Sequence, residues 1–204
     1  MPAPIADSPT REKILQTAQR LFHQHGYSDV GINTLCSEAG VVKGSFYHFF
    51  PSKQALLEAV MERNQQAVEN AFRQSSMAGG NGRERLLAHF SALIANATRE
   101  KADGGRILGC ATGTLASELA AVNEAARVTS AGAFRTWRQQ LENLLRQGVE
   151  DGSIAQTVDP PSTSLSLLAV IQGMSVLGRC FNQPEMLTDI AQTTLKRLLP
   201  VRAQ

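Results

Sequence analysis

A short stretch between Ala39 and Leu57 gathers side chains that could recognise another molecule. It contains no Asp or Glu, and its basic and polar members include Lys43, Ser45, Tyr47, His48 and Lys53. Such groups donate hydrogen bonds to phosphate oxygens and base edges, and Gly44 among them permits close approach of a backbone. The stretch has the chemistry of a nucleic-acid contact, although the whole chain carries a formal charge of only +2.

Three short helices would position these side chains. The first carries apolar residues at helical spacing over 14–22. The second covers 32–39, and the third fits between Val42 and Phe50, where Pro51 ends it. Two short helices joined by a turn containing glycine form a helix-turn-helix, whose second helix enters the major groove of DNA.

A helical wheel gives the third helix two different faces. Its apolar face is predicted to consist of Val42, Phe46, Phe49 and Phe50. The opposite face is predicted to consist of Lys43, Gly44, Tyr47 and His48. An ordinary amphipathic helix with a solvated polar face would show the same division, so composition alone leaves both interpretations open.

The rest of the chain is also helical in pattern, and no stretch alternates at period two. Further helices are predicted at about 52–74, 83–99, 107–122, 124–150, 161–182 and 185–199. Gly-, Ser- and Pro-containing segments separate them. The sequence therefore predicts an all-α fold in which a three-helix head is joined by a long fourth helix to a larger helical bundle.

The run from Thr10 to Leu57 closely resembles the N-terminal domain of TetR-family transcriptional regulators. Its segments TREKILQTAQRLFHQHGY and LCSEAGVVKGSFYHFFPSKQALL carry the likeness. The resemblance implies a DNA-binding domain over 8–52, with the helix-turn-helix at about 31–50, and an effector-binding and dimerisation domain over 53–204. It also implies that Ser45, Tyr47 and His48 lie on the recognition helix and that Lys53 holds a phosphate.

Several positions depart from the family pattern. Val30-Gly31 stands where members often carry Thr-Ser, Val42 where they carry Ser, and Asn33 where they carry Arg. The usual hydroxyl contacts and caps before the second and third helices are therefore missing. Asn33 and Thr34 are expected to take over phosphate or base contacts.

The predicted helix over 161–182 suggests how two copies of the chain would associate. Apolar residues occupy nearly every face of it, as expected of a helix covered by its own bundle on one side and by a partner on the other. The resemblance implies a homodimer formed by helices 161–182 and 185–199, which would match a palindromic DNA operator. A central core helix of a monomer is the alternative.

The segment Leu108 to Glu118 resembles a Gly-Cys…Leu-x-x-Glu segment found in one branch of TetR-like regulators. In some members of that branch this thiol senses electrophiles or oxidants. Cys110 lies near a predicted helix start and one turn from Arg106, which permits reactivity. Cysteine more often serves as a small buried hydrophobe, and this is the expectation for Cys36 and Cys180.

A binding site for a small-molecule effector is expected within the body, because such sites have apolar walls with few polar groups. Its candidate residues are Phe90, Ile94, Cys110, Thr112, Leu115, Phe134, Trp137 and Met174, with His89 for orientation. Each of them could equally belong to the plain core.

Other function classes find little support in the sequence. The G-x-S-x-G, G-x-x-x-x-G-K-[ST], G-x-G-x-x-G and H-E-x-x-H patterns are absent, so we predict no enzyme, no catalytic residue, no cofactor and no metal site. Three widely spaced cysteines fit a reducing cytoplasm, and no membrane span is expected. The resulting prediction is a repressor released from its operator by an effector or by thiol modification. The alternative is an all-helical adaptor without DNA binding.

Overall fold

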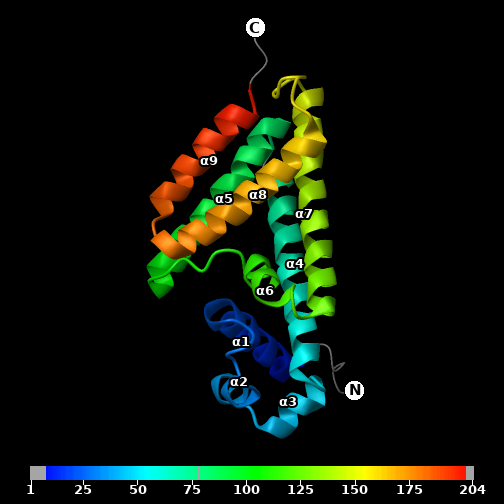
Figure 1. Cartoon of the computed structure of the whole chain (residues 1–204), viewed down its shortest axis with the longest axis vertical. Coiled ribbons are helices and arrows are strands. Elements are labelled where there is room, and N and C mark those ends of the chain that lie inside the picture. Colours follow the sequence, from blue (N-terminus) through cyan, green and yellow to red (C-terminus); the bar gives the residue numbers. More distant parts are fainter. Residues whose placement is uncertain (1–7, 78, 201–204) are drawn as a thin grey trace. The chain divides into compact units, whose positions relative to one another are not determined.

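The computed structural model describes residues 8–77 and 79–200, and within them it contains helices and no strands. This confirms the predicted all-α class (Figure 1). The helices are α1 (Pro9–His25), α2 (Ile32–Ala39), α3 (Lys43–Phe49), α4 (Lys53–Met77), α5 (Gly82–Gly104), α6 (Ala111–Leu119), α7 (Glu124–Glu150), α8 (Pro160–Phe181) and α9 (Pro184–Leu198).

The described chain divides into two compact units, each with its own hydrophobic core. The first comprises residues 8–66 and 114–130, and the second comprises 67–113 and 131–200. The division differs from the predicted boundary after residue 52. The first half of α4 belongs with the head because its apolar side chains, from Leu56 to Met61, are buried in the core of that unit.

The first unit is built around the helix-turn-helix, whose helices α1, α2 and α3 run from dark blue to light blue in Figure 1. Phe22 and Phe46 are fully buried in its core. Gly26 ends α1 with φ +86°, and Gly40 ends α2 in the left-handed region with φ +60°, which glycine adopts without a steric penalty. These two turns set the angles between the three helices.

Part of this first unit comes from much later in the sequence. Leu115 and Leu119 of α6 and Ala126 of α7 are buried in the same core as α1–α4. The Asn123 side chain donates to Gln54 Oε1 of α4 at 3.0 Å. The head is therefore completed by the end of α6 and the start of α7.

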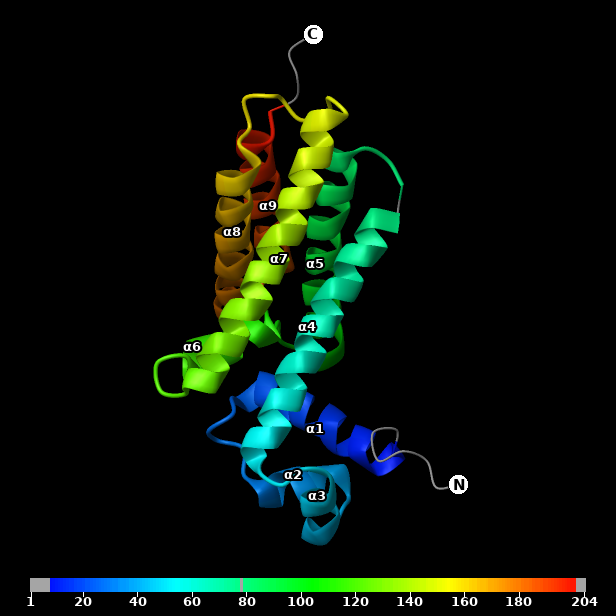
Figure 2. The ribbon, with the colours of Figure 1, turned by 90° about the vertical axis from the view of Figure 1, so that its right-hand side faces the viewer.

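The second unit contains α5, α8 and α9 with most of α7 and the second half of α4, and these helices run lengthwise through the upper part of Figure 2. Its core includes Phe90, Leu141 and Leu167. An Asn81–Glu84 capping box starts α5, which satisfies backbone donors that a helix start otherwise leaves unpaired. At Gly178, a Cβ would lie 3.3 Å from Leu187, so this glycine allows α8 and α9 to pack closely.

The segment before α6 departs most from the prediction of a helix over 107–122. Glu100 Oε2 accepts hydrogen bonds from the backbone N–H groups of Leu108 at 2.8 Å and Gly109 at 3.3 Å. The Asn182 side chain accepts from Ile107 N–H at 2.9 Å. Side chains thus satisfy these backbone donors outside any helix, Gly109 has a positive φ of 75°, and the helix begins at Ala111.

Helix α8 is long and apolar enough to cross a membrane by length and composition. A core helix of a soluble protein passes the same test, and Leu167, Ile171 and Met174 on one side of α8 are buried in the second core. The helix is therefore weak evidence for a membrane span.

Candidate functional site

The predicted outward face of α3 is present in the structure. Lys43, Gly44, Tyr47 and His48 are all exposed, and Ser45 is half-buried. A Cβ at Gly44 would have no heavy atom within 4 Å, so the chain itself leaves this position open. The helix presents two basic groups, a phenol and an open backbone on one face, which suits contact with phosphates and base edges.

The opposite face of α3 holds the helix in the head. Phe46 is fully buried, and Phe50, directly after the helix, is 3% exposed. Their ring centres lie 6.2 Å apart. The prediction for Val42 was wrong, because this side chain is 71% exposed. Val42 is the N-cap residue, with an extended backbone, so the helical wheel does not describe its direction.

The starts of α2 and α3 lack side-chain caps, as the departures from the family pattern predict. Gly31 and Val42 occupy the cap positions, and neither makes a side-chain cap hydrogen bond. Asn33 and Thr34, in the first turn of α2, are exposed. They are accessible for the contacts expected of them.

Lys53 is less accessible than the other predicted DNA-binding residues. It lies in the first turn of α4, after the cap formed by Ser52 Oγ, which accepts from Ala55 N–H at 3.0 Å. Its Nζ donates to the carbonyl oxygen of Tyr27 at 2.6 Å and lies 4.0 Å from the centre of that ring. Partial burial lowers the pKa of Lys53, against the opposing effect of the charges on Glu118 and Asp29.

Glu118 of α6 binds the turn between α1 and α2. Its carboxylate accepts hydrogen bonds from the backbone N–H groups of Tyr27 at 2.8 Å and Ser28 at 2.7 Å. Burial alone would raise the pKa of Glu118, but the hydrogen bonds from Ser28 and Tyr27 and the charge of Lys53 outweigh it and hold this pKa below its ordinary value. Glu118 closes the Gly-Cys…Leu-x-x-Glu segment, and the spacing of that segment does not predict its contact with the α1–α2 turn.

Glycine at position 26 is required by this contact. A Cβ there would lie 2.9 Å from Glu118 Oε2, and the backbone has a positive φ. Hydrogen bonds from the turn to Glu118, and from Lys53 to the turn, join these residues in one cluster. We call it the turn clamp (Tyr27, Ser28, Lys53 and Glu118).

Cys110 lies directly before α6 and packs against the apolar core of the second unit. Its Sγ accepts hydrogen bonds from Gly113 N–H at 3.3 Å and from Gln172 Nε2 of α8 at 3.8 Å. Burial raises the pKa of the Cys110 thiol, because these hydrogen bonds do not compensate for the lost hydration, and Glu100 raises it further. The thiol is therefore protonated at neutral pH.

The other two cysteines differ from one another. Cys36 is buried in the head core, which confirms the expectation for it. The expectation was wrong for Cys180, which is exposed on α8. Position 180 falls on the side of the helix turned away from its own bundle, and an apolar sequence pattern on every face could not reveal this.

The predicted effector-site residues fall into two groups. Leu115 lies in the core of the first unit. The remaining predicted residues lie in the second unit: Phe90, Trp137, Met174 and Thr112 are buried, while Ile94, Phe134 and Cys110 are half-buried. His89, suggested for orientation, is 1% exposed and stacks on Phe72.

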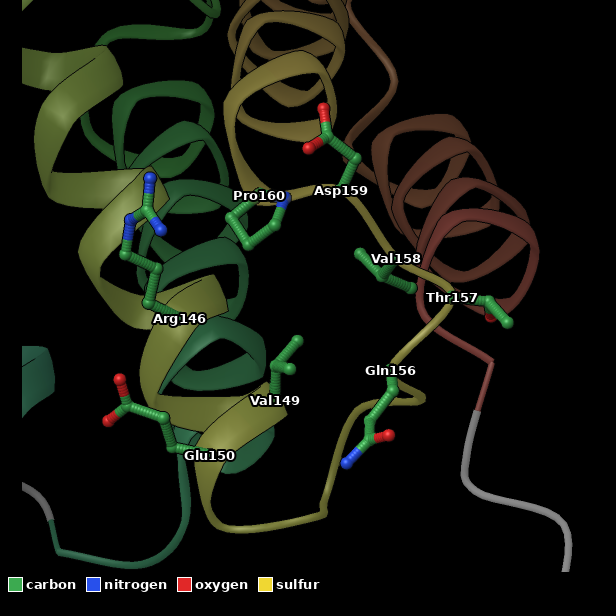
Figure 3. A pocket seen from close by; sticks show the side chains of 8 residues that line it. All are labelled: Arg146, Val149, Glu150, Gln156, Thr157, Val158, Asp159 and Pro160. Carbon is green, nitrogen blue, oxygen red and sulfur yellow. The ribbon is translucent and has the colours of Figure 1, made fainter.

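A surface hollow of about 390 Å³ lies elsewhere in the second unit, between the end of α7 and the segment leading to α8 (Figure 3). Arg146 and Glu150 line it from α7, and residues 156–160 line it from the following segment. None of the predicted effector-site residues contributes to it. Among residues 8–77 and 79–200, no group of three or more His, Cys, Asp or Glu side chains could hold a metal ion.

Two protein-family models match the chain. Residues 14–60 match the model described as bacterial regulatory proteins of the tetR family. Residues 82–194 match the model described as the tetracyclin repressor-like C-terminal domain. The matches cover the helix-turn-helix and most of the second unit.

Curated relatives and solved structures agree with these models. The HTH-type transcriptional repressor NemR of Escherichia coli K12 is 30% identical over 168 residues, which is 82% of each chain. The HTH-type transcriptional repressor DhaR of Mycobacterium sp. GP1 is 26% identical over 200 residues, or 96% of each chain. The crystal structure of the reduced form of E. coli NemR matches with a TM-score of 0.86 and 28% identity, covering 97% of this chain and 100% of the other.

Proposed function

Since this chain belongs to the TetR family of bacterial regulatory proteins and is a DNA-binding transcriptional regulator, we propose that it represses transcription in the cytoplasm. In this proposal a homodimer holds a palindromic operator, and an effector or a modified thiol releases it. Membership of the family sets aside the alternative of a helical adaptor without DNA binding. The relatives that the chain matches are transcriptional regulators, which supports a regulatory role.

The exposed face of α3 is the observation that carries the proposed DNA contact. Lys43, Tyr47 and His48 lie on that face while Phe46 fixes the helix from behind. Asn33 and Thr34 on α2 add polar groups. A helix that is fixed in this way loses less conformational entropy than a mobile segment when its side chains contact base edges.

An exposed apolar face of α8 supports the proposed homodimer. Leu165, Val176 and Phe181 are each more than half exposed. Large exposed apolar side chains on one helix usually mark an interaction surface. A second copy offers the same face, as a two-fold interface requires. Two heads related by a two-fold axis would match a palindromic operator with half-sites about one helical turn apart.

Helix α6 supports the proposed route of release. It begins directly after Cys110 and contains Glu118, which binds the α1–α2 turn of the head. A change at the thiol that shifts or frays α6 would therefore act on the turn clamp, and through it on the head that presents α3. The crystal structure of E. coli NemR is of its reduced form, which supports a role for the redox state of the thiol in this proposal.

A footprint on the DNA upstream of the gene for this chain tests the proposed function. The full chain should protect a two-fold symmetric site there, because such regulators frequently control adjacent genes. Modification of Cys110 by an electrophile should then remove the protection. A chain that protects no DNA under any salt condition would contradict the proposal.

A further inference from the structure

Three aromatic side chains from three helices meet in the core of the second unit. Phe72 of α4 and His89 of α5 stack with ring centres 3.9 Å apart. Trp137 of α7 meets both rings edge-on, at 6.4 Å from each. The three side chains, which we call the ring cluster, are at most 4% exposed and are closed to bulk solvent.

The nitrogen atoms of the ring cluster lack hydrogen-bond partners within the described part of the chain. These atoms are Nδ1 and Nε2 of His89 and Nε1 of Trp137. Buried polar atoms are nearly always paired, with protein, water or a ligand, because an unpaired one loses its hydration without compensation. Two side chains on two helices thus indicate a partner that the described chain does not supply.

The ring cluster is suited to an uncharged partner. Burial lowers the pKa of His89 to about 4, so its ring is neutral near pH 7 and has one donor and one acceptor nitrogen. The Trp137 indole supplies a second donor. Trp137 and Phe72, on which His89 stacks, belong to a core of apolar side chains, and Ile94 and Phe134 pack against that core. A charged group placed among these apolar side chains would lose its hydration.

We propose that the ring cluster is the polar end of the effector site and binds a small, uncharged, largely apolar molecule through a carbonyl or hydroxyl oxygen. The oxygen accepts hydrogen bonds from His89 and Trp137, and the half-buried side chains of Ile94 and Phe134 move to admit the apolar part. Phe72 lies on α4, the helix that begins in the head at Lys53, so a displaced ring cluster acts on a helix shared with the head. This inference rests on the proposed function, in which an effector releases DNA.

The indole N–H of Trp137 provides a direct test, because Trp137 is the sole tryptophan and gives one side-chain indole signal in a ¹H–¹⁵N spectrum. The full chain is titrated with acetophenone, with ethylbenzene, which lacks the oxygen, and with benzoate, which is charged. Acetophenone should shift the indole signal saturably. The other two should bind at least about tenfold more weakly, because a site built to hydrogen-bond an oxygen rejects an analogue without it.

A His89→Phe variant preserves an aromatic ring against Phe72 and removes both nitrogen atoms. It should bind acetophenone about tenfold more weakly while binding operator DNA as the wild type does. Equal responses to all three probes, or none to any, would overturn the inference and leave the ring nitrogens to buried water. An unaltered acetophenone affinity in His89→Phe would also overturn it. Failure of the proposed function would appear separately, as loss of operator binding by the unliganded wild type.

Discussion

Lys53 Nζ lies 2.6 Å from the carbonyl oxygen of Tyr27 and 4.0 Å from the centre of the Tyr27 ring. A hydrogen bond from an ammonium and a cation–π contact thus hold the same side chain. Glu118 binds the N–H group of the same Tyr27. The lysine that family likeness assigns to a DNA phosphate is, in this structure, a part of the turn clamp.

Two lysines of the head should therefore respond differently to removal. Lys43→Ala should weaken binding to all DNA and reduce the salt dependence, because it removes an exposed cation, while leaving the free energy of unfolding nearly unchanged. Lys53→Ala should in addition lower the free energy of unfolding by about 1–3 kcal/mol, because it removes the hydrogen bond from the ammonium to the Tyr27 carbonyl oxygen. Urea unfolding and DNA titrations at several salt concentrations measure both effects. Arg73→Ala, which removes an exposed cation from the second unit, is the control.

Glu118→Gln should destabilise the head. The amide cannot accept both backbone N–H groups as the carboxylate does, so we expect a loss of about 1–3 kcal/mol in the free energy of unfolding. Because the folded pKa of Glu118 is lowered, its contribution should be present at neutral pH and fade as the pH falls below its ordinary value of 4.5. Glu124→Gln, which loses an exposed ion pair with Arg127, should destabilise the chain much less, because solvent screens such a pair. Equal losses in the two variants would show that Glu118 has no special role.

Cys110 should react slowly at neutral pH and faster as the pH rises. Burial raises the pKa of its thiol, so the thiolate fraction should grow about tenfold per pH unit from pH 6 to pH 8. Mass spectrometry after iodoacetamide treatment measures this rate. Operator release by an electrophile should persist in Cys180→Ser, which changes an exposed thiol, and should vanish in Cys110→Ser. A Cys110→Ser variant that still releases DNA would assign sensing to another site.

His89 should make the second unit sensitive to mild acid. The unfolded side chain, with its ordinary pKa of 6.5, takes up a proton between pH 7 and pH 5, whereas the folded one, with a pKa of about 4, does not. Falling pH therefore favours the unfolded chain, by about 2 kcal/mol over this interval. Urea unfolding at both pH values should show this loss in the wild type but not in His89→Phe. The same pH response in both proteins would refute the assignment.

The sequence predicted the three helices of the helix-turn-helix because their signals are local, but it did not predict that residues 114–130 complete the head. Gly26, Gly40 and Pro51 end its helices, and the aromatic side chains of α3 fix which face is buried. The body was harder, since the non-helical segment before α6 is held by hydrogen bonds to the side chains of Glu100 and Asn182. Long-range hydrogen bonds of this kind leave no periodic pattern in a sequence.

Part of the candidate site was equally beyond sequence reasoning. The outward position of Tyr47 and His48 follows from helical spacing, and the structure confirms it. The turn clamp joins Glu118 to Tyr27 across 91 positions, and no spacing rule predicts such a contact. The engagement of Lys53 by Tyr27 could not be read from the sequence for the same reason.

Specific DNA binding through α3 is the central claim, and Tyr47 tests it most directly. A symmetric site should first be selected from a pool of random duplexes with the wild-type protein. The wild-type protein should then bind that recovered site at least about 10³-fold more tightly than a scrambled duplex at the same salt concentration. Tyr47→Ala should lose about 1–3 kcal/mol on that site and little on the scrambled duplex, as measured by fluorescence anisotropy. Equal affinities of wild type and Tyr47→Ala for the recovered site would contradict the account.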